Sequence, residues 1–348
     1  MPDQSSGSKE KGLSARAHAT WLCRLLLSIP ILIAFAGSCL GQGAKVGEAA
    51  FLPGGRVLLD AHNCYPYHGL FSDRIERAIK TGLPLAIEQD LVWYTDKSTG
   101  KSWSIVAHNA PFSGSEPTLK SHFFERIRPI VESALRENKK NGWPLITLNL
   151  DFKTEEAEHL AAIWDLLGEY ESWLCTAERS SESAKLSPLQ VRPVLVLTGS
   201  SEAQQRVFHD DVLAGKPLRL FGAVRLREGS TSIDQRVPPA DNYRRWWNNA
   251  WSVVEAAGQS QAGEWTGSEV ERLKALVRCA HAQGLWIRFY TLNGHALTAS
   301  RGWNESYNFG SEEAARLRWQ AAVAAGVDFV ATDQYEAFSS LRAKQEGK

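Results

Sequence analysis

The main chemical signal in this sequence comes from two histidines and an acidic pair, each placed just after a short apolar run. The residues are His62, Glu88 with Asp90, and His108. Imidazole can act as a general acid or a general base near neutral pH. His62 and His108 are therefore predicted to be the catalytic acid and base, with the role of each left open.

A second set of side chains offers oxygen atoms to a cation. Alternation along a strand puts Glu88 and Asp90 on the same side, where two carboxylates repel unless a cation or a shared proton intervenes. Asp151 ends a further apolar run, and Asn63 follows His62 directly. Three carboxylates and one amide oxygen suit one divalent cation, Ca²⁺ or Mg²⁺, rather than zinc. The predicted ligands are Asn63, Glu88, Asp90 and Asp151.

Three more residues are predicted to bind a substrate. Lys153 lies two residues after Asp151 and on the same side of that strand, where it could neutralise a phosphoryl oxygen. A salt bridge to Asp151 or Glu88 is the alternative. Arg288 and Tyr290 share one side of a later strand, where they either face the substrate or pack inside the fold.

These positions require a fold whose strands all end at one face. Apolar runs alternate with helical patterns and no internal repeat is present, so we expect an α/β fold, a single (β/α)8 TIM-type barrel. Active sites of such barrels lie at the C-terminal ends of the strands. The expected strands are residues 57–59, 85–87, 105–107, 145–150, 193–198, 220–226, 285–291 and 327–332. The expected helices are 72–80, 123–138, 201–211, 268–283 and 312–325, with one more starting at Thr154 as its N-cap.

The N-terminal region has the pattern of a signal peptide, predicted over residues 1–41. Basic residues precede an apolar stretch at 25–37, which is short for a membrane span. This predicts export to the periplasm or the extracellular space. An anchor on lipidated Cys39 and an uncleaved membrane anchor are the alternatives. A linker is expected at 42–54, the barrel at 55–340 and a C-terminal tail at 341–348.

Composition limits the class of partner. The chain has 39 basic and 39 acidic residues, without the basic excess of a nucleic-acid-binding protein. After signal cleavage, Cys64, Cys175 and Cys279 would allow at most one disulfide. The oligomeric state is not predicted.

The order of the motifs resembles the PLC-like phosphodiesterase superfamily, which includes phosphatidylinositol phospholipase C and glycerophosphodiester phosphodiesterase TIM barrels. The matching segments are His62-Asn63, Glu88-Gln89-Asp90 and His108. Asp151-Phe152-Lys153 is more similar to the sphingomyelinase D branch, and residues 326–333 are similar to the last strand of glycerophosphodiester phosphodiesterases. Those diesterases begin with His-Arg where this chain has His-Asn, so the substrate is not predicted.

The resemblance implies a secreted, metal-dependent phosphoric diester hydrolase. Its partner would be a small-molecule or lipid phosphodiester, and a membrane surface would be met only through a lipid substrate. One alternative is a barrel without turnover that binds a phosphodiester or glycan through the Trp-rich stretch at 244–251. Another is glycoside hydrolysis by Glu88 and Asp90, which leaves both histidines unused.

Overall fold

A closed ring of parallel strands forms the centre of the folded part of the chain. The computed structural model describes residues 51–67, 70–229, 232–255, 263–296 and 308–346. Contacts divide the chain into Met1–Gly43 and Ala44–Lys348, and everything described lies in the second unit. The barrel strands are β1 (Leu58–Ala61), β2 (Leu85–Thr95), β4 (Ile146–Phe152), β7 (Val194–Thr198), β9 (Phe221–Ala223), β10 (Arg244–Ala250), β11 (Trp286–Tyr290) and β12 (Phe329–Thr332). Each pairs in parallel with its neighbours, and β1 closes the ring by pairing with both β2 and β12. The predicted (β/α)8 barrel is confirmed.

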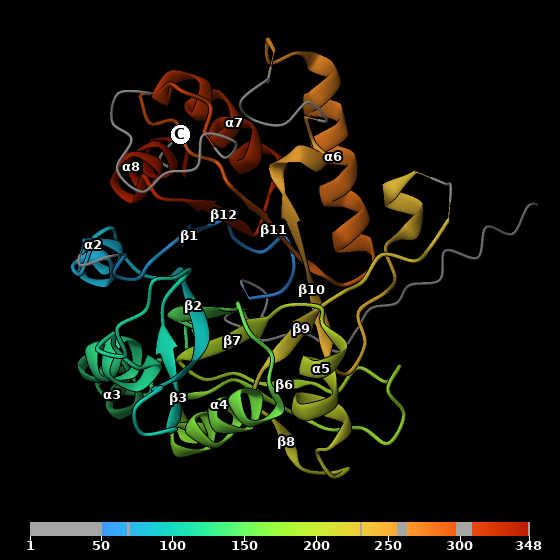
Figure 1. Cartoon of the computed structure of the whole chain (residues 1–348). Coiled ribbons are helices and arrows are strands. Elements are labelled where there is room, and N and C mark those ends of the chain that lie inside the picture. Colours follow the sequence, from blue (N-terminus) through green and yellow to red (C-terminus); the bar gives the residue numbers. More distant parts are fainter. Residues whose placement is uncertain (1–50, 68–69, 230–231, 256–262, 297–307, 347–348) are drawn as a thin grey trace, which may run out of the picture. The chain divides into compact units, whose positions relative to one another are not determined.

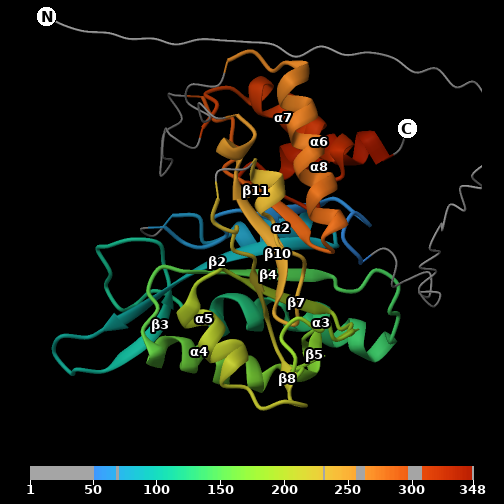
Figure 2. The same ribbon diagram turned by 90° about the vertical axis from the view of Figure 1, so that its right-hand side faces the viewer.

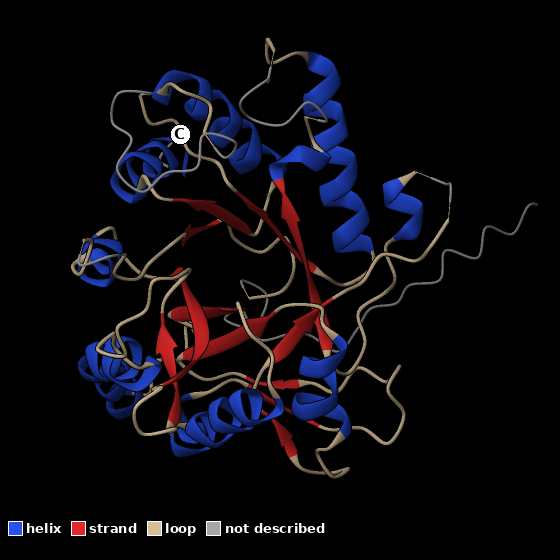
Figure 3. Cartoon of the chain, viewed as in Figure 1, coloured by secondary structure: helices blue, strands red, loops and turns tan. Residues whose placement is uncertain are grey.

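The helices lie outside this ring (Figures 1 and 3). They are α2 (Arg74–Lys80), α3 (Glu125–Glu137), α4 (Ala157–Glu169), α5 (Glu202–Gln205), α6 (Gly267–Ala282), α7 (Glu312–Ala325) and α8 (Tyr335–Glu346). π-helical turns η1 (Lys120–Phe124) and η3 (Arg206–Asp210) adjoin α3 and α5, and 3₁₀ turns η2 (Glu171–Trp173), η4 (Ile233–Arg236) and η5 (Trp251–Val253) occur in loops. A small sheet of β5 (Thr176–Glu178), β6 (Leu189–Gln190) and β8 (Pro217–Leu218) is separate from the barrel. No described helix is long and apolar enough to cross a bilayer.

Local sequence sets the ends of the longer helices. The side chain of Ser311 accepts a hydrogen bond from the backbone of Ala314 at the start of α7, and Gly326 ends that helix with φ 78°. The predicted range 312–325 is therefore confirmed. The N-cap predicted at Thr154 is wrong, because its hydroxyl accepts the backbone N–H of Trp93 and Glu156 precedes α4 without a side-chain cap.

Two of the strands differ from the prediction. The strand expected at 105–107 is part of β3 (Ser102–Val106), which pairs antiparallel with the end of β2 and is not a barrel strand. The connection at 96–101 is too short for a parallel crossover, which needs about a dozen residues. Figure 2 shows this hairpin extending away from the other strands. The missing barrel strand is β10, whose Arg-, Trp- and Asn-rich sequence lacks the apolar run that marks the others.

The residues proposed above as a Trp-rich binding surface belong to the interior. Trp246, Trp247 and Trp251 are 1%, 2% and 0% exposed. Trp246 packs in an apolar layer with Trp286 and Phe329, the layer nearest the N-terminal ends of the strands. These tryptophans therefore do not form an exposed binding surface, although Asn248 of the same stretch lines the cavity of the candidate site.

The predicted segment boundaries can be compared with the structure at the linker and at the C-terminal tail, but not at the signal peptide. Residues 1–41, including the predicted signal peptide and Cys39, lie outside the described residues. Phe51, in the expected linker, is buried against Trp286. The expected tail at 341–348 begins inside α8, which ends at Glu346. The three cysteines that the structure describes are free thiols, so no disulfide links them.

One buried histidine makes stability depend on pH. Burial, helped by the nearby Arg126, lowers the pKa of His122 from 6.5 to about 4. The unfolded chain then binds more protons than the folded one between these values, so stability is full above about pH 6.5 and falls as the pH drops toward 4.

We therefore expect wild type to lose about 3 kcal/mol relative to His122→Gln between about pH 7 and pH 4. Urea unfolding of both proteins at the two pH values measures this difference. Equal losses in the two proteins would contradict the assignment.

Candidate active site

One cavity of about 580 Å³ opens at the C-terminal ends of the barrel strands. Its volume lies within the range of small-molecule sites. The predicted site residues all line it: His62, Asn63, Glu88, Asp90, His108, Asp151, Lys153, Arg288 and Tyr290. The parallel register produces this gathering, because strands that run in one direction end at one face.

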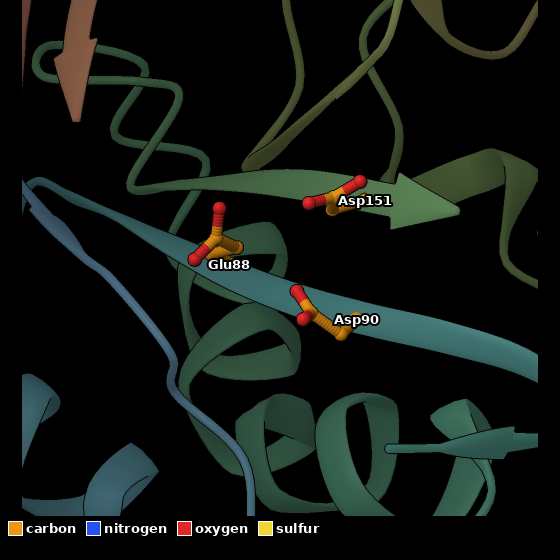
Figure 4. Close-up of side chains that lie close together, drawn as sticks. All are labelled: Glu88, Asp90 and Asp151. Carbon is orange, nitrogen blue, oxygen red and sulfur yellow. The ribbon is translucent and has the colours of Figure 1, made fainter. Parts of the chain in front are cut away.

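Three carboxylates form the acidic part of the cavity. Glu88 and Asp90 project from β2 and Asp151 from the adjacent β4, and Figure 4 shows the three side chains facing a common space. One oxygen of each lies within 4.8 Å of the others. Asp90 and Asp151 are direct partners in the strand register.

Asp90 shows that this cluster suits a cation. It is 1% exposed, and a positive charge already lies beside it, since Lys153 Nζ is 3.0 Å from Asp90 Oδ2. Burial, with the charges of Glu88 and Asp151, raises the pKa of Asp90 well above its ordinary value. A buried carboxylate beside two others is stabilised by positive charge, and an all-oxygen set is typical of Ca²⁺ and Mg²⁺ sites.

Asn63 is held by hydrogen bonds to neighbouring residues. Its backbone, at φ 51°, directs the N–H to Glu88 Oε2 at 2.8 Å. Its side-chain oxygen accepts the Tyr65 hydroxyl at 2.6 Å, and its amide nitrogen donates to both oxygens of Asp333. The Asn63 amide oxygen is thus engaged by Tyr65, while the Asn63 backbone orients Glu88, and the role of Asn63 as a cation ligand stays a prediction.

Arg288 is held inside the barrel by two acids. Its side chain is 2% exposed and donates to Asp60 and, at 2.9 Å, to Glu88 Oε1; a further bond goes to Asn248. Burial opposes ionisation of Glu88, but His62, Arg288 and the Asn63 N–H outweigh it and lower the pKa of Glu88 to about 2. Arg288 lines the cavity as predicted, while most of its hydrogen-bonding capacity is used by the protein.

His62 forms a close pair with Asp333. Its Nδ1 lies 2.6 Å from Asp333 Oδ1, and its Nε2 lies 3.6 Å from Glu88 Oε2. Burial disfavours the imidazolium, but the charges of Glu88 and Asp333 outweigh that effect and raise the pKa of His62 to about 9. The ring also stacks on Tyr290 at 6.4 Å between centroids, which places Tyr290 beside the histidine.

Asp333, the partner of His62, is not among the site residues predicted from the sequence. It directly follows β12, so the rule that selected Asp151 could also have selected it. Asn293 holds it in place, since its side-chain oxygen accepts the Asp333 backbone N–H at 2.8 Å and its amide donates to Asp333 Oδ1 at 3.2 Å. A carboxylate on Nδ1 fixes the orientation of the ring and leaves Nε2 to face the cavity.

His108 reaches the site by a different route from the one predicted. It follows β3, outside the barrel, but the backbone N–H of Ala107 donates to Asp90 O and brings the chain back over β2. Its Nε2 lies 3.8 Å from Asp90 Oδ2, and its side chain is 44% exposed. Burial and the charge of Lys153 lower the pKa of His108. The two histidines therefore have pKa values shifted in opposite directions.

Three solved structures are weakly similar to this chain. A calcium-dependent phosphoinositol-specific phospholipase C from a Pseudomonas species is 14% identical, with TM-score 0.44, over 82% of this chain and 91% of its own. A glycerophosphoryl diester phosphodiesterase from Parabacteroides distasonis is 10% identical, with TM-score 0.37, over 78% and 80%. HPPK-DHPS of Plasmodium falciparum is 8% identical, with TM-score 0.38, over 84% and 47%.

The first two are phosphodiesterases by name, but at these identities and TM-scores they say nothing about this chain beyond the closed parallel barrel that its own strand pairing shows. No family model matches the chain, and no curated protein is significantly similar to it.

The His62–Asp333 pair can be tested by substitution. In Asp333→Asn protein without added metal, we expect the pKa of His62 to fall by about 1–3 units, because one of its two neighbouring charges is gone. NMR of ring-labelled histidine measures this pKa.

Asp328→Asn is the matched control, since Asp328 is also buried and paired with a histidine, His281, but precedes β12 at the opposite end of the barrel. It should leave the His62 titration unchanged. An unaltered His62 pKa in Asp333→Asn would contradict the pairing.

Proposed function

We propose that this chain is an exported, metal-dependent phosphoric diester hydrolase. The observation that carries the proposal is that an Asp-paired histidine and three clustered carboxylates share one cavity. Hydrolysis of a phosphodiester uses such acid–base groups to transfer protons and a cation bound by oxygen atoms to stabilise the charge on the phosphate. Export is inferred from the N-terminal sequence.

Glu88, Asp90 and Asp151 would hold the cation. A divalent ion bound there would neutralise charge on the phosphate and lower the pKa of the attacking hydroxyl or water. Glu88 is suited to this role because its low pKa keeps it ionised and two protein groups fix its position. Both Ca²⁺ and Mg²⁺ are compatible with these ligands.

The opposite pKa shifts support a division of labour between the histidines. His62, with a pKa of about 9, keeps its proton at neutral pH and is assigned as the acid that protonates the leaving alcohol. His108, whose pKa is lowered, is neutral there and is assigned as the base that takes the proton of the nucleophile. Sequence reasoning left these two roles open.

The substrate is proposed to be a glycerophosphodiester or the headgroup of a phospholipid. A phosphodiester is a monoanion, and the cavity offers the cationic side chains of Lys153 and Arg288 next to the carboxylates. The glycoside hydrolase alternative is not favoured, because it gives no role to a histidine held by its own aspartate.

Activity and its metal dependence are tested together. We expect turnover of bis-p-nitrophenyl phosphate or of glycerophosphodiesters, its loss in EDTA, and its recovery with Ca²⁺ or Mg²⁺. His62→Ala should lower kcat by about 10²–10⁴-fold, because proton transfer to the leaving group is lost.

His281→Ala is the control, since His281 contacts Asp328 at the other end of the barrel. Activity that survives EDTA would contradict the proposed need for a cation. Full activity in His62→Ala would contradict the assignment of His62 as the general acid.

The assigned roles also determine the pH profile. The rate should fall toward low pH as His108, whose pKa is lowered, gains a proton, and fall again near pH 9 as His62 loses one. Measuring kcat/KM across this range checks both limits. In Asp333→Asn the alkaline limit should move to lower pH, and a shift of the acidic limit alone would reverse the two roles.

A further inference from the structure

Lys153 contacts two of the three clustered carboxylates at once. Its Nζ lies 2.7 Å from Asp151 Oδ2 and 3.0 Å from Asp90 Oδ2. The backbone on which it stands is fixed, because the Lys153 N–H donates to Leu91 O at 2.8 Å. The ammonium group is thus held across β2 and β4, on oxygens that belong to the proposed cation ligands.

The Lys153 side chain is less confined than that of Arg288, which also contacts this cluster. Arg288 is 2% exposed and is bound on several sides by Asp60, Glu88 and Asn248. The Lys153 side chain is 25% exposed, and it forms ion pairs with Asp90 and Asp151. A lysine ammonium is a point charge on a flexible four-carbon stem, so it can move away from these oxygens where Arg288 cannot.

A divalent cation and the Lys153 ammonium cannot both be close to Asp90 and Asp151 without strong repulsion, since like charges a few ångströms apart in a half-buried site are poorly screened. Movement of the ammonium toward solvent keeps it in the cavity that it already lines. There it can meet an anionic ligand oxygen.

We propose that Lys153 is an internal counter-ion that competes with the divalent cation for Asp90 and Asp151, and that it turns to the phosphate of the substrate when displaced. This inference rests on the cation site of the proposed function. Its consequence is coupling: the protein alone binds the cation weakly, and an anionic phosphodiester tightens that binding by pairing with the displaced ammonium.

Calorimetry tests the competition without any turnover. Mg²⁺ and Ca²⁺ are each titrated into wild type, Lys153→Met and Lys153→Gln, with and without dimethyl phosphate as the anionic probe. We expect both variants to bind the cation about tenfold more tightly than wild type. Dimethyl phosphate should tighten cation binding in wild type and have little effect in the variants.

Lys120→Met is the matched control, because Lys120 also pairs with one carboxylate, Glu169, but on the outer surface. It should bind the cation as wild type does. Lys153→Gln keeps a polar side chain, so it provides the comparison if Lys153→Met does not fold.

The outcomes separate the two proposals. If both Lys153 variants bind the cation as tightly as wild type or more weakly, Lys153 is not a competing counter-ion, but the proposed cation site is unaffected. Cation binding that is insensitive to dimethyl phosphate in wild type overturns the coupling. No cation binding in any of the proteins overturns both the cation site of the proposed function and this inference.

Discussion

The site depends on the charge carried by Arg288 inside the barrel. Its guanidinium group joins Asp60 on β1 to Glu88 on β2, and all three side chains are less than a tenth exposed. Removing one partner of such a buried pair generally costs about 3–5 kcal/mol, because the other charge is left without compensation. Together with His62, Arg288 therefore keeps Glu88 ionised and oriented in the wall of the cavity.

The barrel interior has an apolar layer that stabilises the fold and a polar layer that forms the candidate site. Near the N-terminal ends of the strands the interior is apolar, with Trp246, Trp286 and Phe329 packed together. Charged and amide side chains replace them toward the C-terminal ends, where the cavity opens. Alternation puts every second residue of a strand inside, so one short strand can contribute to both layers. β11 does so through Trp286, Arg288 and Tyr290.

The opposite pKa shifts of the two histidines follow from their distances to carboxylates. His62 is buried between Asp333 and Glu88, and those two charges outweigh the cost of burying an imidazolium. His108 is half-exposed, and its closest acid contact, Asp90 at 3.8 Å, is shared with Lys153. Two imidazoles in one cavity thus acquire the different proton affinities that acid–base catalysis needs.

The sequence by itself determined the barrel class and nine of the residues that line the cavity, because apolar strand runs and the polar groups that end them are local features. Local patterns could not reveal which strands close the ring. The connection before residues 105–107 is short, so these residues form a hairpin strand. β10 was not predicted, because its arginines and asparagines interrupt the apolar pattern of a strand. Only the tertiary structure paired His62 with Asp333, 271 positions apart, and brought the Asn63 amide to the same aspartate. Such contacts arise when the first and last strands meet, and closure of a ring is a property of the whole fold.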